Sequence, residues 1–171
     1  MKRKHIMFTI LSVVLVGGML QQYAAAKKTT NAVNTLHVTH EAKRPSFQGG
    51  SKTFTGKAKI DMLFLPNAHR HASAANVTFQ PGARTAWHSH PAGQTLVVTS
   101  GTGWVQRWGK AKKVIKVGDV VWIPPNTKHW HGATQKTSMT HTAIQEQRKG
   151  KVVTWMELVS DLQYTGVKKK K

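Results

Sequence analysis

Three segments of the sequence carry histidines at spacings that can bind a metal ion. His88 and His90 lie two residues apart, His129 and His131 repeat this spacing, and His141 lies in a third segment of the same character. Side chains alternate between the two faces of a strand, so residues two apart point the same way. Five histidines in phase on three strands favour a shared metal site over isolated, hydrogen-bonded structural side chains.

Gln94 follows His90 by four residues and is the unusual member of this set. Three neutral imidazoles and a neutral amide leave a divalent ion its full charge, whereas a glutamate would cancel one unit of it. At a separation of about 4 Å in a partly buried site, that unit is worth several kcal/mol. Such a site holds its metal less tightly but attracts anions and polarises a bound carbonyl, hydroxyl or cyanide more strongly. The ligand types leave Mn, Fe, Zn, Ni and Co open.

Short β runs separated by turn signals must position these side chains. Strands are expected at 53–65, 75–80, 85–90, 94–101, 103–109, 113–117, 118–125, 128–134, 139–147 and 151–158, and a short helix over 156–164. Turns every eight to twelve residues or so predict an all-β sandwich or barrel. Arg84, beside the first histidine segment, is expected either at the mouth of a pocket, facing an anion, or in a surface ion pair.

The first 26 residues have the pattern of a secretory signal peptide. A basic start, "MKRKH", precedes an apolar run at 6–20 and the small residues "AAA" at 24–26. The alternative is a membrane anchor, but a span needs about 20 apolar residues, so no stable anchor is expected. We expect cleavage after Ala26 and export to the periplasm or outside the cell. A flexible arm at 27–50, one β domain at 51–165 and a basic tail at 166–171 follow.

The chain has no cysteine and a strongly basic composition. Any metal site must therefore use nitrogen and oxygen ligands. Removing Lys2, Arg3 and Lys4 with the signal peptide lowers the formal net charge from +20 to +17. Apart from "KKKK" at 168–171 the basic residues are scattered, without alternating aromatic residues. This favours attraction to anionic surfaces of the cell envelope and predicts no nucleic-acid partner.

Glycines and prolines around the histidines complete two longer patterns. Residues 82–101 (G-x5-H-x-H-x3-Q-x6-G) resemble the first cupin motif, G-x5-H-x-H-x3,4-E-x6-G, with glutamine in the glutamate position. Residues 118–133 (G-x5-P-x-N-x2-H-x3-A) resemble the second, G-x5-P-x-G-x2-H-x3-N, with asparagine and alanine at two positions. The resemblance implies a cupin domain at 51–165, that is, an all-β jelly-roll-type double-stranded β-helix barrel, with a short C-terminal helix.

A narrower resemblance covers about residues 47–164, nearly the whole chain after the predicted cleavage. Segments such as "ASAANVTFQPGARTAWHSHPAGQTLVVTSGTGWVQ" and "GDVVWIPPNTKHWHGA" are similar to small bacterial manganese-dependent cupins with (R)-selective hydroxynitrile (mandelonitrile) lyase activity. This resemblance implies manganese as the metal and a homodimer or homotetramer. It implies the metal ligands His88, His90, Gln94 and His129. It also implies that His131 and His141 line the pocket behind the ligands, and it implies substrate-pocket positions for Ala75, Val77 and Gln145.

Three functions remain open from the sequence. The leading hypothesis is a C–C lyase for cyanohydrins or similar small 2-hydroxy compounds, in which His131 or His141 moves the hydroxyl proton. The second is a manganese- or iron-dependent oxidoreductase of the dioxygenase type. The third is a non-catalytic exported protein that binds a metal or a small anion. No Ser-His-Asp or paired-carboxylate arrangement supports hydrolysis of those kinds.

Overall fold

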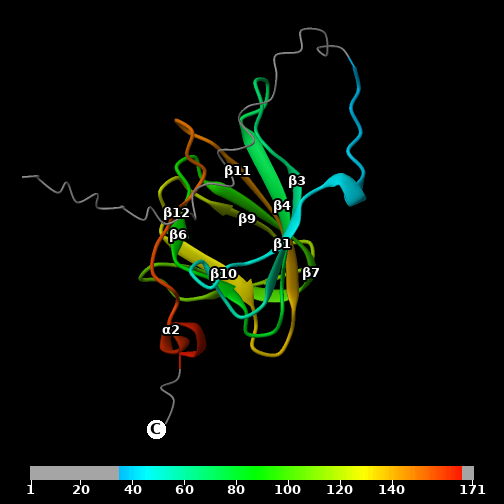
Figure 1. Cartoon of the computed structure of the whole chain (residues 1–171). Helices are drawn as coiled ribbons and strands as arrows, with labels where there is room; N and C mark the ends of the chain where they lie inside the picture. Colours follow the sequence, from blue (N-terminus) through cyan, green and yellow to red (C-terminus); the bar gives the residue numbers. More distant parts are fainter. Residues whose placement is uncertain (1–34, 167–171) are drawn as a thin grey trace, which may run out of the picture. The chain divides into compact units, whose positions relative to one another are not determined.

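Antiparallel β-strands dominate the computed structural model, which describes residues 35–166 (Figure 1). From Thr39 onward these residues form one folded unit. The strands are β1 (Ser46–Gln48), β2 (Phe54–Thr55), β3 (Ala58–Phe64), β4 (Ala72–Phe79), β5 (Arg84–Thr85), β6 (His88–Ser89), β7 (Gln94–Arg107), β8 (Lys113–Lys116), β9 (Val120–Ile123), β10 (His129–Ala133), β11 (Met139–Glu146) and β12 (Thr154–Trp155). A 3-10 helix, η2 (Glu41–Lys43), and an α-helix, α2 (Asp161–Thr165), complete the elements. The all-β prediction is confirmed.

A single long strand, β7, joins the two halves of the curled sheet. Its first part pairs with β9 and β11, in the half that also contains β4, β3 and β1, and its second part pairs with β8 and β10. The sequence predicts two strands here, separated at Thr102, but the chain bends without a break. Gly101 permits the bend, because its φ is +71° and a Cβ there would lie 2.0 Å from the Ser138 carbonyl oxygen.

The main core lies between the two halves, where alternate residues of β4, β7 and β11 point inward. Phe79, Leu96 and Met139 are fully buried within it, together with Val98 and Ala143. Each large apolar side chain contributes about 1.5–3 kcal/mol when it is removed from water. This core holds the strands that carry the histidines in a fixed register.

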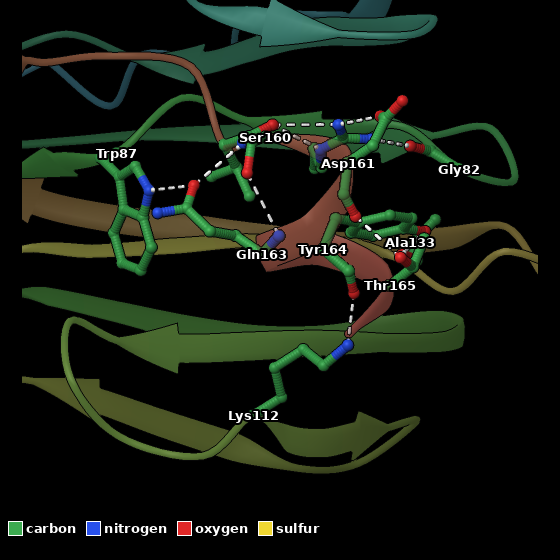
Figure 2. Close-up of polar contacts among 11 residues, drawn as sticks. Gly82, Trp87, Lys112, Ala133, Ser160, Asp161, Gln163, Tyr164 and Thr165 are labelled. Carbon is green, nitrogen blue, oxygen red and sulfur yellow. Dashed lines mark hydrogen bonds and ion pairs between the residues drawn. The ribbon is translucent and has the colours of Figure 1, made fainter. Parts of the chain in front are cut away.

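A second apolar cluster covers the outer face of β10. Trp130 lies between His129 and His131 in sequence and therefore points to the opposite face, where it packs with Trp87, Val159 and Tyr164. The Tyr164 hydroxyl donates to the Ala133 carbonyl at 2.9 Å (Figure 2). The C-terminal segment thus supports the histidine-bearing strand from behind.

The C-terminal helix is shorter than the predicted 156–164. The Ser160 side chain accepts from the Gln163 backbone, and the Gln163 side chain accepts from the Ser160 backbone, a capping box that fixes the first turn (Figure 2). Gln163 also accepts from the Trp87 indole at 3.3 Å. Residues before Ser160 stay extended because Trp87 exchanges backbone hydrogen bonds with Met156 and Glu157.

One strand lies before the predicted domain boundary at residue 51. β1, within the predicted arm at 27–50, pairs with β3 through three consecutive residues. The predicted signal peptide at 1–26, the start of the arm and residues 167–171 of the predicted tail lie outside the described residues. Within residues 35–166, no helix has the length and apolar character needed to cross a bilayer.

Candidate metal centre

Two rows of directly paired residues bring the predicted ligands together. On one half of the sheet the row runs Arg107, His129, His88 and Trp155, across β7, β10, β6 and β12. On the other half it runs Ile123, Gln94, Gln145 and Ser73, across β9, β7, β11 and β4. Directly paired residues of antiparallel strands share a face. Each row therefore carries its polar side chains to the same inner face.

The polar side chains of the site are almost inaccessible to solvent. The predicted residues that are at most 4% exposed are His88, His90, Gln94, His129, His131 and His141. One ring nitrogen from each of His88, His129 and His131 lies within 4.8 Å of the others. The ring of His90 has its centroid 5.1 Å from that of His88 and 5.7 Å from that of His129. Distances alone therefore allow either His131 or His90 to be the third histidine ligand of a metal ion.

Hydrogen bonds distinguish the two candidates. The Nδ1 atoms of His88, His90 and His129 lie 3.0, 2.7 and 2.8 Å from the backbone carbonyls of Ala86, Val152 and Thr127 respectively. A carbonyl only accepts, so each Nδ1 carries the hydrogen and each Nε2 keeps a lone pair for a metal. His131 differs, because its Nδ1 faces the Nε2 of His141 at 3.0 Å. The backbone therefore prepares His88, His90 and His129 as ligands.

The contact between His129 and Gln94 tests whether a metal ion fits here. Gln94 Nε2 donates to Gln145 Oε1 at 3.3 Å, which turns Gln94 Oε1 toward His129 Nε2 at 3.1 Å. With its hydrogen on Nδ1, neutral His129 presents a lone pair to a second acceptor. Two acceptors repel unless a cation lies between them, and ligand atoms at right angles around an ion with bonds of about 2.1 Å lie about 3 Å apart. His90 Nε2 is buried without a hydrogen-bond partner in the described structure, so its lone pair is also available to a cation. The donor set fits a divalent ion.

Burial lowers the pKa of every histidine in the site. Desolvation lowers the pKa of His129 and of His141 to about 4. It lowers the pKa of His88 and His131 well below the ordinary value, with neighbouring histidines adding to the effect, and also lowers the pKa of His90. The imidazoles are consequently neutral near pH 7. Neutral imidazole is the form that binds a metal or accepts a proton.

His131 and His141 form a buried pair next to the three ligand candidates. Their 3.0 Å contact requires one ring to donate, yet His131 Nε2 and His141 Nδ1 have no partner within the described residues. The ring of His131 lies 5.2 Å from that of His88, centroid to centroid. A proton accepted by one ring can therefore pass to the other along the contact.

The three predicted pocket positions lie on β4 and β11, the strands beside the histidine pair. Ala75 and Val77 pair directly with Ala143 and His141 and are buried, and Gln145 donates to Ser73 at 3.0 Å. Ser73 holds the Gln145–Gln94 chain in place and was not predicted, because its role depends on the pairing of β4 with β11.

Arg84 is buried behind the sheet and does not line the pocket. Its guanidinium donates to the Val159 carbonyl at 2.9 Å and pairs with Asp161 at 2.9 Å. Of its two predicted placements, the ion pair is the observed one, although the guanidinium is buried rather than on the surface. The other described histidines, His37, His40, His69 and His71, are exposed and lie outside the site.

A cavity of about 440 Å³ opens beside His129. Val105, Val121 and Ile123 line it, and so do Arg107, Lys110 and Lys113. Ala75, Val77 and Gln145 are not among its lining residues. Sequence reasoning missed the basic residues, because only the pairing of β7 with β8 and β10 shows that they face the site.

Comparison with known proteins gives consistent matches. Residues 75–144 match the model of the cupin domain. An (R)-mandelonitrile lyase from Granulicella tundricola is 52% identical over 129 residues, which cover 75% of this chain and 98% of that protein.

Solved structures also match this chain. A crystal structure of a cupin-like protein from Thermotoga maritima is 41% identical, with a TM-score of 0.67, over 72% of this chain and 94% of that one. The polyketide cyclase RemF from Streptomyces resistomycificus shares the fold at 14% identity, with a TM-score of 0.60, over 76% and 91% of the two chains.

Proposed function

Because this chain belongs to the cupin family, we propose that it is a metal-dependent lyase that cleaves cyanohydrins to a carbonyl compound and hydrogen cyanide. The observation that carries the proposal is the contact of two acceptors, His129 Nε2 and Gln94 Oε1, within a buried cluster of neutral imidazoles. The 52% identity to an (R)-mandelonitrile lyase supports the choice of reaction.

In this proposal His88, His90, Gln94 and His129 hold the ion, with manganese as the metal implied by the family resemblance. When bound, a divalent ion supplies Lewis-acid stabilisation of the negative charge that develops in the reaction. The side chain of Gln94 is neutral, so it leaves the positive charge of the ion undiminished. Its amide is held by Gln145, and Gln145 by Ser73, so the oxygen stays directed at the ligand cluster.

The His131–His141 pair takes the proton of the substrate hydroxyl. The O–H bond breaks, its electrons form the carbonyl, and the C–C bond breaks with its electron pair leaving on cyanide. Burial lowers the pKa of each ring and keeps both neutral near pH 7, so a nitrogen lone pair is available when the hydroxyl proton leaves. The pair then returns the proton to cyanide. A positioned acid–base group of this kind contributes about 10²–10⁴-fold to the rate.

The proposal predicts that the protein loaded with manganese cleaves racemic mandelonitrile and consumes the (R)-enantiomer first. Benzaldehyde formation and chiral chromatography of the remaining substrate measure the result, beside metal content from elemental analysis. The matched control is the same protein after chelation, which should return to the background rate. Stoichiometric metal without turnover on mandelonitrile or aliphatic cyanohydrins would indicate a non-catalytic binding protein instead.

A Gln94→Glu variant should bind its metal about tenfold more tightly or better and turn over cyanohydrins about tenfold more slowly. The added carboxylate cancels one unit of the ion's charge in a buried site, which strengthens binding and weakens Lewis acidity. Competition with a chelator gives the affinity, and initial rates give the turnover. Gln80→Glu, an exposed substitution of the same kind, is the control. Unchanged metal affinity and rate in the Gln94 variant would remove this residue from the ligand set.

We also propose that the protein is exported, on the strength of the basic and apolar pattern at residues 1–26. Comparing the mass of the natural protein with that expected for cleavage after Ala26 tests this.

A further inference from the structure

The cavity beside His129 combines an apolar wall with a basic rim. It lies between the free edges of β8 and β9, each of which pairs with a different part of β7. Its volume of about 440 Å³ is well above the roughly 150 Å³ that an apolar cavity needs for a benzene ring. A ring with a substituent of several atoms therefore fits.

Strand register places two of these basic residues on the histidine-bearing face, where their side chains are exposed at the cavity. Arg107 pairs directly with His129, and Lys113 pairs with Val105, which in turn pairs with His131. Directly paired residues share one face of the sheet. Arg107 and Lys113 are therefore attached to the face that carries His129 and His131. Lys110 joins them because its backbone closes a turn onto the Arg107 carbonyl at 3.0 Å.

The apolar wall belongs to the same surface. Ile123 pairs directly with Gln94, Val121 pairs with Leu96, and both Ile123 and Val105 are buried. The wall therefore ends at Ile123, the strand neighbour of the predicted ligand Gln94, and at His129.

No carboxylate within residues 35–166 forms an ion pair with these three cations. All six acidic residues of the chain lie in this described part. Asp61, Asp161 and Glu157 pair instead with Lys59, Arg84 and Lys128 respectively. Glu41, Asp119 and Glu146 form no ion pair with Arg107, Lys110 or Lys113. Three cations around one apolar cavity, without an ion-pair partner among residues 35–166, are complementary to an anionic ligand with an apolar body.

We propose that the natural substrate of the site carries a carboxylate on an apolar, ring-sized body, and that Arg107, Lys110 and Lys113 bind this carboxylate at the cavity mouth. The inference rests on the proposed function, since it names the class of cyanohydrin or 2-hydroxy compound that the lyase takes. The planar fork of Arg107 suits a carboxylate, which it binds through two parallel hydrogen bonds. The apolar wall suits the ring, and the reacting group then reaches toward His129.

The test compares benzoate with benzamide, which has nearly the same shape but no charge. Isothermal titration of the metal-loaded protein should give at least about tenfold tighter binding of benzoate. An Arg107→Gln/Lys110→Gln/Lys113→Gln variant should lose this preference while its metal content stays the same. The control, Lys52→Gln/Lys57→Gln/Lys136→Gln, removes the same charge from exposed positions outside the cavity and should keep the preference.

Two results would overturn the inference. Benzoate binding that survives in the first triple variant would place the carboxylate on the metal alone, and equal losses in both triple variants would reduce the effect to net charge. The proposed function is tested separately by mandelonitrile cleavage. Cleavage without a benzoate preference overturns only the carboxylate site, whereas the preference without cleavage overturns only the lyase.

Discussion

Replacing His129 with alanine is expected to abolish stoichiometric metal binding and to lower cyanohydrin turnover at least about 100-fold. His129 lies at the centre of the site, because its ring contacts Gln94 and packs 4.1 Å from that of His88, centroid to centroid. Its loss removes one imidazole ligand and releases the amide oxygen of Gln94. Replacing even groups that only orient ligands costs about 10–100-fold in metal affinity or activity, so losing a ligand costs more. Elemental analysis after dialysis and initial rates measure both effects.

The controls separate ligand loss from unfolding. His129→Gln retains a polar side chain of similar size, and His71→Ala makes the same chemical change at an exposed position. Cooperative thermal unfolding of each variant, followed by circular dichroism, establishes that it folds. A folded His129→Ala variant with full metal content and turnover would refute the proposed site.

The same measurements decide between the two possible third histidines. His90→Ala should lose metal, since the contact of His90 Nδ1 with the Val152 carbonyl leaves a buried Nε2 lone pair without a partner in the described residues. His131→Ala should keep metal and lose turnover, because His131 contacts His141 rather than a backbone carbonyl. The reverse pattern would make His131 the ligand, as its short distance to His88 and His129 allows.

Much of the site was readable in the sequence because its determinants are local. His88 and His129 each donate to the carbonyl two residues earlier, Ala86 and Thr127, so the spacing that places a ring inward also sets its tautomer. The alternation of His129, Trp130 and His131 likewise follows from strand geometry alone.

The features that the sequence did not reveal depend on contacts between distant residues. The Val152 carbonyl that orients His90 lies 62 residues away. The burial of Arg84 depends on the return of the C-terminal segment to β5, where Val159 and Asp161 meet its guanidinium. The basic rim depends on register, which no local pattern specifies, since a shift of one residue moves a side chain to the opposite face.

The metal-free protein is expected to lose about 6 kcal/mol of stability as the pH falls from about 6.5 to about 4. His129 and His141 have a pKa of about 4 in the folded state, lowered by burial from 6.5. Between these values the unfolded chain binds protons that the folded chain excludes, so the free energy of unfolding decreases as the pH decreases. At 1.36 kcal/mol per pKa unit each histidine accounts for about 3 kcal/mol. The other three histidines of the site act in the same direction, since burial lowers their pKa as well.

Urea titrations at half-unit steps of pH measure this loss, and the slope of unfolding free energy against pH gives the protons taken up on unfolding. We expect an uptake of at least two protons near pH 5, in a protein whose total stability is of the usual order of 5–15 kcal/mol. A His141→Gln variant, which retains a polar side chain but cannot titrate, should take up about one proton fewer. A flat profile between pH 6.5 and 4.5 would mean that these imidazoles titrate alike in the folded and unfolded protein, and an equal slope in the variant would mean the same for His141. That outcome would contradict the lowering of the pKa of these rings by burial in the folded protein.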